Sequence, residues 1–131
     1  MTRGLRNNNP GNIRLSATQW AGEVRPSRDN AFCTFRSMAY GYRAMIRTLQ
    51  TYARKHACRT IPDFIKRWAP SIENDTASYI KSVCAQMKVT PTQVINVDDK
   101  ATMCALVSAI SKHENGVPAN MAEVESGWQL L

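Results

Sequence analysis

The stretch Lys100–Gly116, KATMCALVSAISKHENG, decides the fold that we expect, because its apolar residues recur at helical spacing on more than one side. These apolar positions are Ala101, Cys104, Ala105, Val107, Ala109 and Ile110. Asp98 or Asp99 is placed to cap the start, and Gly116 followed by Pro118 is typical of a helix end. A helix that neighbours cover from several sides belongs at the centre of the molecule.

Glu114 falls in the last turn of this predicted helix. A carboxylate there faces the negative end of the helix dipole, which disfavours ionisation, as would an apolar wall beside it. That environment suits a general acid. The alternative is a solvated carboxylate at the helix end, balanced by Lys112 and His113. Glu114 is therefore the first candidate for a catalytic residue, and the surface alternative stays open.

Length and composition predict a single domain, residues 1–131, with a sizeable core, since 44% of the residues are apolar and 8% aromatic. The net charge of +7 and the pI near 9.6 indicate a polyanionic partner: nucleic acid, an anionic membrane surface or the bacterial cell wall. No apolar run approaches the ~18–20 residues of a membrane span. The polar start, MTRGLRNNNPGN, lacks the apolar stretch of a signal peptide.

The four cysteines, Cys33, Cys58, Cys84 and Cys104, are far apart and form no CxxC pair. No His stands at ligand spacing from them, so we expect no metal site, and no motif calls for a cofactor. Most of these cysteines lie within apolar helical patterns, where Cys behaves as a small core residue. Buried thiols are therefore favoured over disulfides, which an extracytoplasmic destination would permit.

The rest of the chain predicts a mainly α or α+β fold, with a small N-terminal hairpin lobe and five or six helices around the central one. Residues 3–14, RGLRNNNPGNIR, predict a turn-rich segment and no regular helix. Short strands are expected over Ile13–Trp20 and Phe32–Phe35. The expected helix starts are Ser37, Thr60, Asn74 or Asp75, and Asn120, with a short turn at Thr90-Pro91. A cleft is expected between the lobe and the helices.

Several motifs along nearly the whole chain resemble one protein family. They are RGLRNNNPGNIR (Arg3–Arg14), FCTFRSMAYGYRA (Phe32–Ala44), RWAP (Arg67–Pro70) with ENDT (Glu73–Thr76) and Tyr79, and HENG (His113–Gly116). They resemble small phage and prophage proteins that are often labelled virion structural proteins. The same family appears as lysozyme-like modules of bacterial antagonistic effectors. The resemblance implies a lysozyme-like fold.

A more distant likeness concerns the order of the motifs. Asn9–Arg14, then Trp20-Ala-Gly, then Phe32–Ser37 look like the segment of autolysin and flagellar-type glucosaminidases in which an Asn-Leu-Phe-Gly-Ile-Lys string leads to Trp-x-Gly and an aromatic strand. In those enzymes the segment follows a helix that ends in the catalytic Glu and a Gly. Here the helix of that character, Leu106–Gly116, stands at the other end of the chain. The likeness implies a circularly permuted arrangement in which Glu114 folds back beside Asn9–Arg14.

These resemblances imply a muramidase-type hydrolase that cleaves the glycan strand of peptidoglycan, with Glu114 protonating the glycosidic oxygen. Lytic transglycosylation stays an alternative, and the bond that is cut stays open. A second carboxylate would act as base or stabiliser, and Glu23 is the first candidate, with Asp29 as its alternative. Glu73 is the rival acid, although its place before a helix N-terminus suits a base better. Some relatives need one acid, because the acetamido group of the sugar acts as the nucleophile.

Substrate-binding residues are expected among the polar and aromatic side chains of the lobe. Amides suit N-acetyl and hydroxyl groups, and aromatic rings stack on sugar faces. The candidates are Asn9, Asn12, Arg14, Trp20 and Tyr40. The alternatives are turn formation for the Asn residues and core packing for the aromatic ones, which we expect for Trp68.

The alternative function is a non-catalytic basic module of a virion that grips cell wall or nucleic acid. No recognition helix with grouped Arg, Lys and Asn is evident, so we expect no specific nucleic-acid partner. Peptidoglycan lies outside the cytoplasm, so a phage particle, a lysis system or a secretion apparatus would deliver this antibacterial chain to the periplasm or cell wall. We expect a monomer, with an immunity or inhibitor protein as a candidate partner.

Overall fold

The computed structural model describes residues 1–72 and 74–131, and within them the chain is mainly helical with a small two-stranded sheet. The elements in order are α1 (Arg3–Arg6), β1 (Glu23–Val24), β2 (Thr34–Phe35), α2 (Met38–His56), α3 (Ile61–Trp68), α4 (Thr76–Met87), α5 (Lys100–Asn115) and α6 (Met121–Gln129). The two strands are antiparallel, with Glu23 opposite Phe35. This agrees with the predicted fold class.

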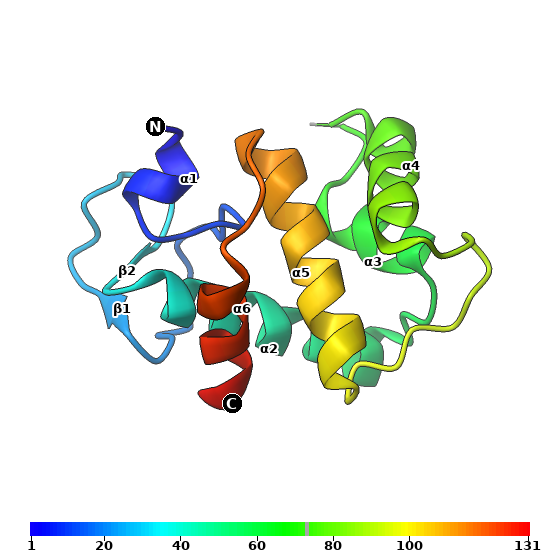
Figure 1. Ribbon diagram of the computed structural model, residues 1–131. Helices are drawn as coiled ribbons and strands as arrows, with labels where there is room; N and C mark the ends of the chain where they lie inside the picture. The colour runs from blue at the N-terminus through cyan, green and yellow to red at the C-terminus, as the bar shows by residue number, and fades with distance from the viewer. Residues whose placement is uncertain (73) are drawn as a thin grey trace.

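The central helix is α5, as predicted from its apolar pattern. It runs through the middle of the molecule between the lobe of α1, β1 and β2 on one side and α3 with α4 on the other (Figure 1). Helices α1, α2, α4 and α6 pack against it. Asp99 caps its start by accepting a hydrogen bond from the Thr102 N–H at 2.9 Å. Gly116, with φ of 74°, ends it, because glycine adopts the left-handed conformation at no steric cost.

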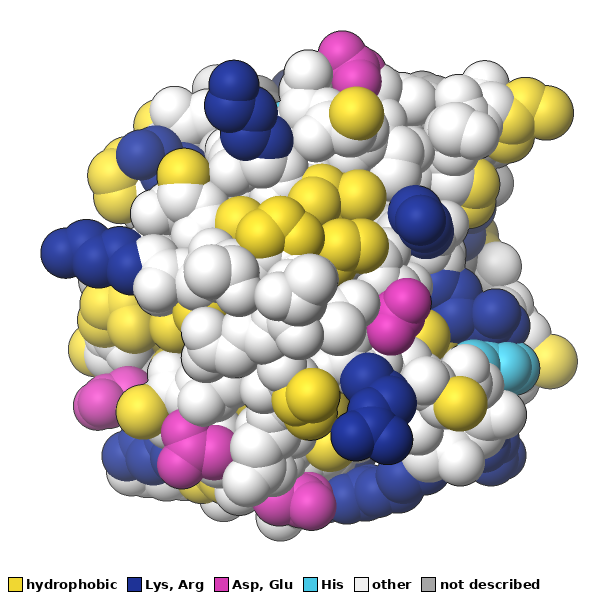
Figure 2. All heavy atoms as spheres, turned by 90° about the vertical axis from the view of Figure 1, so that its right-hand side faces the viewer, with side chains coloured by type: hydrophobic (Ala, Val, Ile, Leu, Met, Phe, Trp, Pro, Cys, Tyr) yellow, Lys and Arg dark blue, Asp and Glu magenta, His cyan; other side chains and the backbone are white. Residues whose placement is uncertain are grey.

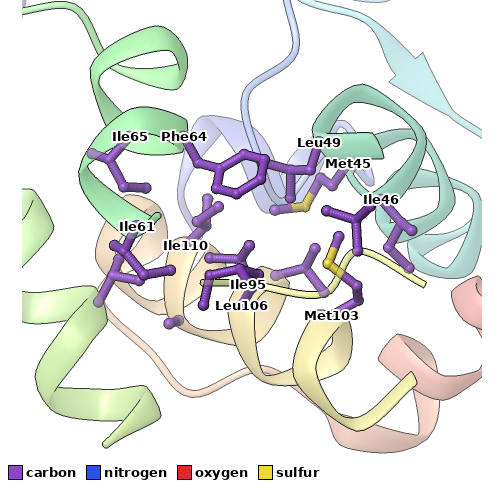
Figure 3. Close-up of a cluster of buried hydrophobic side chains, with 14 of the residues drawn as sticks. Met45, Ile46, Leu49, Ile61, Phe64, Ile65, Ile95, Met103, Leu106 and Ile110 are labelled. Carbon is purple, nitrogen blue, oxygen red and sulfur yellow. The ribbon is translucent and has the colours of Figure 1, made fainter. Parts of the chain in front are cut away.

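The main core lies between α2, α3 and α5, whose apolar side chains point toward one another (Figure 3). Met45 and Leu49 of α2, Phe64 of α3, and Leu106 and Ile110 of α5 are all fully buried. Burial of a side chain of this size contributes about 1.5–3 kcal/mol to folding. A second, smaller cluster joins the lobe to α2. It consists of Cys33, Phe35 and Ala44, with Ile13, Trp20 and Tyr40 packed against it.

The helix starts fall at the predicted capping residues. Asp75 accepts a hydrogen bond from the Ser78 N–H at 3.1 Å, and Asn120 accepts one from the Ala122 N–H at 3.0 Å. At the start of α3, the Asp63 carboxylate reaches back to the Thr60 N–H at 3.1 Å. Each cap satisfies a backbone N–H that the helix itself leaves unpaired. At Thr90-Pro91 the structure has a turn, as expected.

The N-terminal lobe differs from the prediction in two places. Residues Arg3–Arg6 form one turn of helix, because Thr2 caps it before the run of Asn residues begins. The first strand is Glu23–Val24 and not Ile13–Trp20, of which Arg14 alone makes an isolated bridge to Phe32. Farther along, the Arg25 guanidinium donates hydrogen bonds to the Ser16 and Thr18 carbonyls at 3.0 and 2.7 Å. These backbone carbonyls are thus paired with a side chain and not with a neighbouring strand.

All four cysteines are buried free thiols, as favoured by the sequence. Burial raises the pKa of each thiol, and it raises that of Cys33 to about 11. The reactive thiolate form is therefore scarce at neutral pH. Within residues 1–72 and 74–131, no three His, Cys, Asp or Glu side chains are placed to hold a metal ion. No helix in these ranges has the length and apolar character needed to cross a membrane.

Gly41 lets α2 approach the N-terminal segment closely. A Cβ atom there would lie 2.2 Å from the Asn8 carbonyl oxygen and 2.6 Å from Pro10 Cδ. In an open helix, Gly→Ala would stabilise by up to about 1 kcal/mol. Here we expect Gly41→Ala to destabilise the protein by about 1–3 kcal/mol, because backbone must move. Urea unfolding measures this, with Thr51→Ala on the exposed face of α2 as control. A gain of stability in Gly41→Ala would contradict the close approach.

Candidate functional site

A cleft of about 410 Å³ lies where four parts of the chain meet. The N-terminal segment contributes Gly11, Asn12 and Arg14, the chain around the end of α3 contributes Trp68, Ala69 and Asn74, the lobe contributes Phe32, and α5 contributes Glu114. The cleft therefore lies between the lobe and the helices, as predicted. Because α5 is held by neighbours on several sides, the cleft has a rigid element at its base.

Glu114 is half-buried at the C-terminal end of α5 and faces this cleft. Asn12 Nδ2 donates a hydrogen bond to Glu114 Oε1 at 2.9 Å. The prediction that Glu114 folds back beside the Asn9–Arg14 segment is thereby confirmed. Among the residues lining the cleft that the structure describes, Glu114 is the one carboxylate.

Tyr79 of α4 lies behind Glu114. Its ring stacks on His113, with centroids 3.8 Å apart, and its side chain is 1% exposed. Burial and the nearby Glu114 carboxylate raise the pKa of the Tyr79 phenol. The hydroxyl makes no hydrogen bond of ordinary geometry within the described part of the chain. Glu114 thus has a buried aromatic side chain close to it.

The end of α5 is tied to the N-terminal segment through Asn115. Asn115 Nδ2 donates to the Pro10 carbonyl at 2.9 Å, and Asn115 Oδ1 accepts from Thr2 Oγ1 at 2.7 Å. Asn8 and Asn12 both have φ of 52°, in the left-handed region that Asn tolerates better than most residues. This conformation turns the segment back on itself and points the Asn12 amide at Glu114.

No family model matches the chain, but one curated relative is similar to it over nearly its whole length. It is 39% identical over 131 residues to "Protein P5" of Pseudoalteromonas phage PM2, and the alignment covers 97% of this chain and 80% of the phage protein. The chain belongs to the family of this Protein P5. The name of that relative states no activity, so the function of this P5-family chain has to be argued from its site.

Two predicted site residues of this P5-family chain, Asn9 and Asn12, have different surroundings. Asn9 is 0% exposed, and its amide donates to the Ile13 and Cys33 carbonyls, both at 2.9 Å. Its oxygen accepts from the Ile13 N–H at 2.9 Å. Asn9 therefore holds the segment in shape and has no polar atom turned to the cleft. Asn12 lines the cleft.

Trp20 and Tyr40 lie in the lobe's small core and do not line the cleft. The Trp20 indole N–H is buried without a hydrogen-bond partner in the part of the chain described here. The Tyr40 hydroxyl accepts a hydrogen bond from Arg36 at 2.7 Å. Arg14 does line the cleft and lies over the Phe32 ring, 5.0 Å from its centroid. Of these three predicted substrate-binding residues, the structure places Arg14 at the cleft.

The candidate second carboxylates are held away from Glu114. Glu23 accepts from the Trp20 N–H at 3.0 Å and pairs with Arg25 at 2.9 Å. Asp29 accepts two hydrogen bonds from Arg3, at 2.6 and 2.7 Å. Neither lines the cleft. Glu73, the rival acid, lies outside the described residues.

Trp68 is a cleft residue that the sequence analysis did not assign to the site, since we expected it in the core. It packs against the core on one side and lines the cleft on the other. The RWAP motif, which carries part of the family resemblance, was the signal that could have identified it. Tyr79 belongs to the same resemblance and was likewise not assigned to the site.

The ion pair between Asp29 and Arg3 joins the loop before β2 to the N-terminal segment. The Arg3 guanidinium and the Ala31 and Phe32 N–H groups hold the pKa of Asp29 well below its usual value of 3.8. A carboxylate with a lowered folded-state pKa stabilises the protein above its unfolded-state pKa, and this contribution is lost as the pH falls below it. We expect Asp29→Asn to be less stable than wild type near neutral pH, and the difference to shrink below about pH 4. Thermal melts across pH measure this difference in stability. A difference that grows on acidification would contradict a stabilising role for the Asp29 carboxylate.

Positive charge is spread over the face of the molecule that Figure 2 shows. On the face seen from the right-hand side of Figure 1, Lys and Arg side chains lie at several separate places, with neutral and apolar groups between them (Figure 2). Part of the charge is paired, as in Arg54 with Asp98 at 2.9 Å. The net charge of +7 favours attraction to an anionic surface.

Proposed function

We propose that this P5-family chain is a lysozyme-like enzyme that cleaves the glycan strand of peptidoglycan, with Glu114 as the general acid. The observation that carries the proposal is the position of Glu114. It is the cleft carboxylate at the end of a rigid central helix, and Asn12 of the NPGNIR segment fixes it through a 2.9 Å hydrogen bond. A positioned carboxyl group beside an open cleft is what glycosidic bond cleavage needs.

In the proposed reaction, protonated Glu114 gives its proton to the glycosidic oxygen as the bond from that oxygen to the sugar C1 breaks. Asn12 donates to one carboxyl oxygen, Oε1, and so fixes the orientation of the carboxyl group. The buried Tyr79 phenol lies close to this carboxyl group.

The step that follows uses the acetamido group of the substrate. Its carbonyl oxygen attacks C1 and forms a cyclic oxazolinium ion, which a water molecule opens in hydrolysis. The muramyl 6-hydroxyl opens it in transglycosylation. In either case the attacking O–H gives its proton to the Glu114 carboxylate, which restores the acid. This route suits the site, because the other candidate carboxylates Glu23 and Asp29 are engaged with Arg25 and Arg3. Buried thiols with raised pKa values make a cysteine nucleophile a poor alternative.

The experiment is incubation of the full chain with purified peptidoglycan sacculi, followed by turbidity and by mass analysis of the released glycan ends. Cleavage supports the proposal. Hydrolysis leaves reducing ends, and transglycosylation leaves anhydro ends that are lighter by one water. Sacculi that bind the protein in a salt-sensitive manner without being cut would overturn it, and would favour the basic binding module that the net charge also suits.

A further inference from the structure

A second hollow, of about 330 Å³, adjoins the cleft of Glu114. The two share Gly11, Asn12, Arg14 and Trp68 as lining residues. The second hollow continues past Trp68 to Thr48 and Tyr52 of α2 and to Pro70. Because they share these four lining residues, we treat the two hollows as the two halves of one groove, with Trp68 lining both.

The second hollow has an aromatic corner. The rings of Tyr52 and Trp68 meet edge to face, with centroids 6.4 Å apart and planes at 70°. The Arg67 guanidinium lies over Tyr52, 5.3 Å from the ring centroid, and His56 meets Tyr52 edge to face at 6.2 Å. Tyr52 is therefore fixed by neighbours on several sides. Its pKa is raised by burial, so the phenol stays neutral.

The two halves of the groove differ in chemistry. Glu114, Asn12 and Asn74 make the first half polar. Ile13, Pro70 and the two aromatic rings make the second half largely apolar, and Thr48 adds a hydroxyl that donates to the Ala44 carbonyl at 2.8 Å. A pyranose ring has C–H groups on its faces and hydroxyls at its rim. Aromatic faces, whose quadrupole is negative, attract such C–H groups.

We propose that the hollow of Tyr52, Thr48, Pro70 and Trp68 is a subsite for a second N-acetylated sugar unit of the same glycan strand. The inference rests on the proposed function, since it takes the glycan as ligand. The shared lining of the two hollows supports this inference. A glycan strand that places one glycosidic bond at Glu114 and follows the groove passes over Trp68 into this hollow. The subsite contributes binding along the strand, and Glu114 performs the chemistry.

Thr48 and Thr51 offer a matched pair for the test. Both lie on α2, and each hydroxyl donates to the carbonyl four residues earlier, at 2.8 and 3.0 Å. Thr48 lines the hollow, while Thr51 is exposed and does not. Thr48→Trp would fill the hollow, and Thr51→Trp would add the same bulk outside it. Pro70→Trp fills the hollow from the opposite wall, should Thr48→Trp lower the melting temperature.

The experiment is calorimetric titration with soluble β-1,4-linked N-acetylglucosamine hexasaccharide, with each variant built on the full chain carrying Glu114→Gln so that no cleavage occurs. We expect Thr48→Trp and Pro70→Trp to weaken binding by about tenfold relative to Thr51→Trp. Equal affinity in all three, or no binding in any, would overturn the subsite.

This result is independent of the enzyme assay. Binding that Thr48→Trp weakens, in a protein whose wild type cleaves no peptidoglycan, would leave the subsite standing and overturn the hydrolase. Cleavage by wild type, with equal hexasaccharide binding by the Trp variants, would overturn the subsite and leave the hydrolase standing.

Discussion

Glu114→Gln is expected to lower the rate of peptidoglycan cleavage by about 10²–10⁴-fold, the range typical of general acid catalysis. Gln has nearly the same size and keeps an oxygen that accepts the hydrogen bond from Asn12 Nδ2. It has no carboxyl proton to give to the leaving oxygen. Initial rates of soluble glycan release, with wild type and variant at equal concentration, measure the effect.

The fold of Glu114→Gln should be unchanged, because the side chain is half-buried and the bond to Asn12 persists. Its melting temperature is measured first for that reason. Glu123→Gln on α6 is the matched control, since Glu123 is also half-buried and does not line the cleft. We expect it to retain full activity. If a folded Glu114→Gln variant cleaves as fast as wild type, another residue must be the general acid, and the proposed mechanism is wrong.

The helical part of the fold was predictable because its signals are local. The apolar period of α5, its Asp99 cap and its Gly116 stop are all carried by residues within the helix or next to it. The contact between Glu114 and the Asn9–Arg14 segment is not local, since Asn12 and Glu114 are 102 residues apart in sequence. It was predicted from the likeness in motif order, which shows which segments belong together where periodicity cannot.

The roles of single polar residues in the lobe were harder to predict. A run of Asn residues shows that tight turns are present, but not which amide faces inward. Asn9 turned out to be buried and Asn12 to line the cleft. For Glu23 a signal existed: Arg25 follows two residues later, and side chains two apart on an extended segment share one face. That pairing, which the structure shows at 2.9 Å, could have been weighed against a catalytic role.

Asn9→Ala is expected to be among the most destabilising single substitutions in the lobe. It would leave the Cys33 carbonyl and the Ile13 N–H without the Asn9 amide, which is itself 0% exposed, while the Ile13 carbonyl keeps its bond from the Cys33 N–H at 2.9 Å. A buried polar group left unpaired costs about 1–3 kcal/mol, so the two together predict a loss of about 2–5 kcal/mol. For a chain of this length, such a loss lowers the melting temperature by roughly 5–20 °C.

Thermal and urea unfolding measure this loss, with Asn74→Ala as the control, because Asn74 is an exposed Asn of the cleft whose amide donates to the Pro70 carbonyl at 3.2 Å. Asn74→Ala should change stability by less than about 0.5 kcal/mol. The activity of Asn9→Ala, measured well below its melting temperature, should stay close to that of wild type, because Asn9 turns no polar atom toward the cleft. An unchanged melting temperature with weakened glycan binding would give Asn9 the substrate-binding role that the sequence alone predicted, since it would mean that the amide serves the ligand and not the fold.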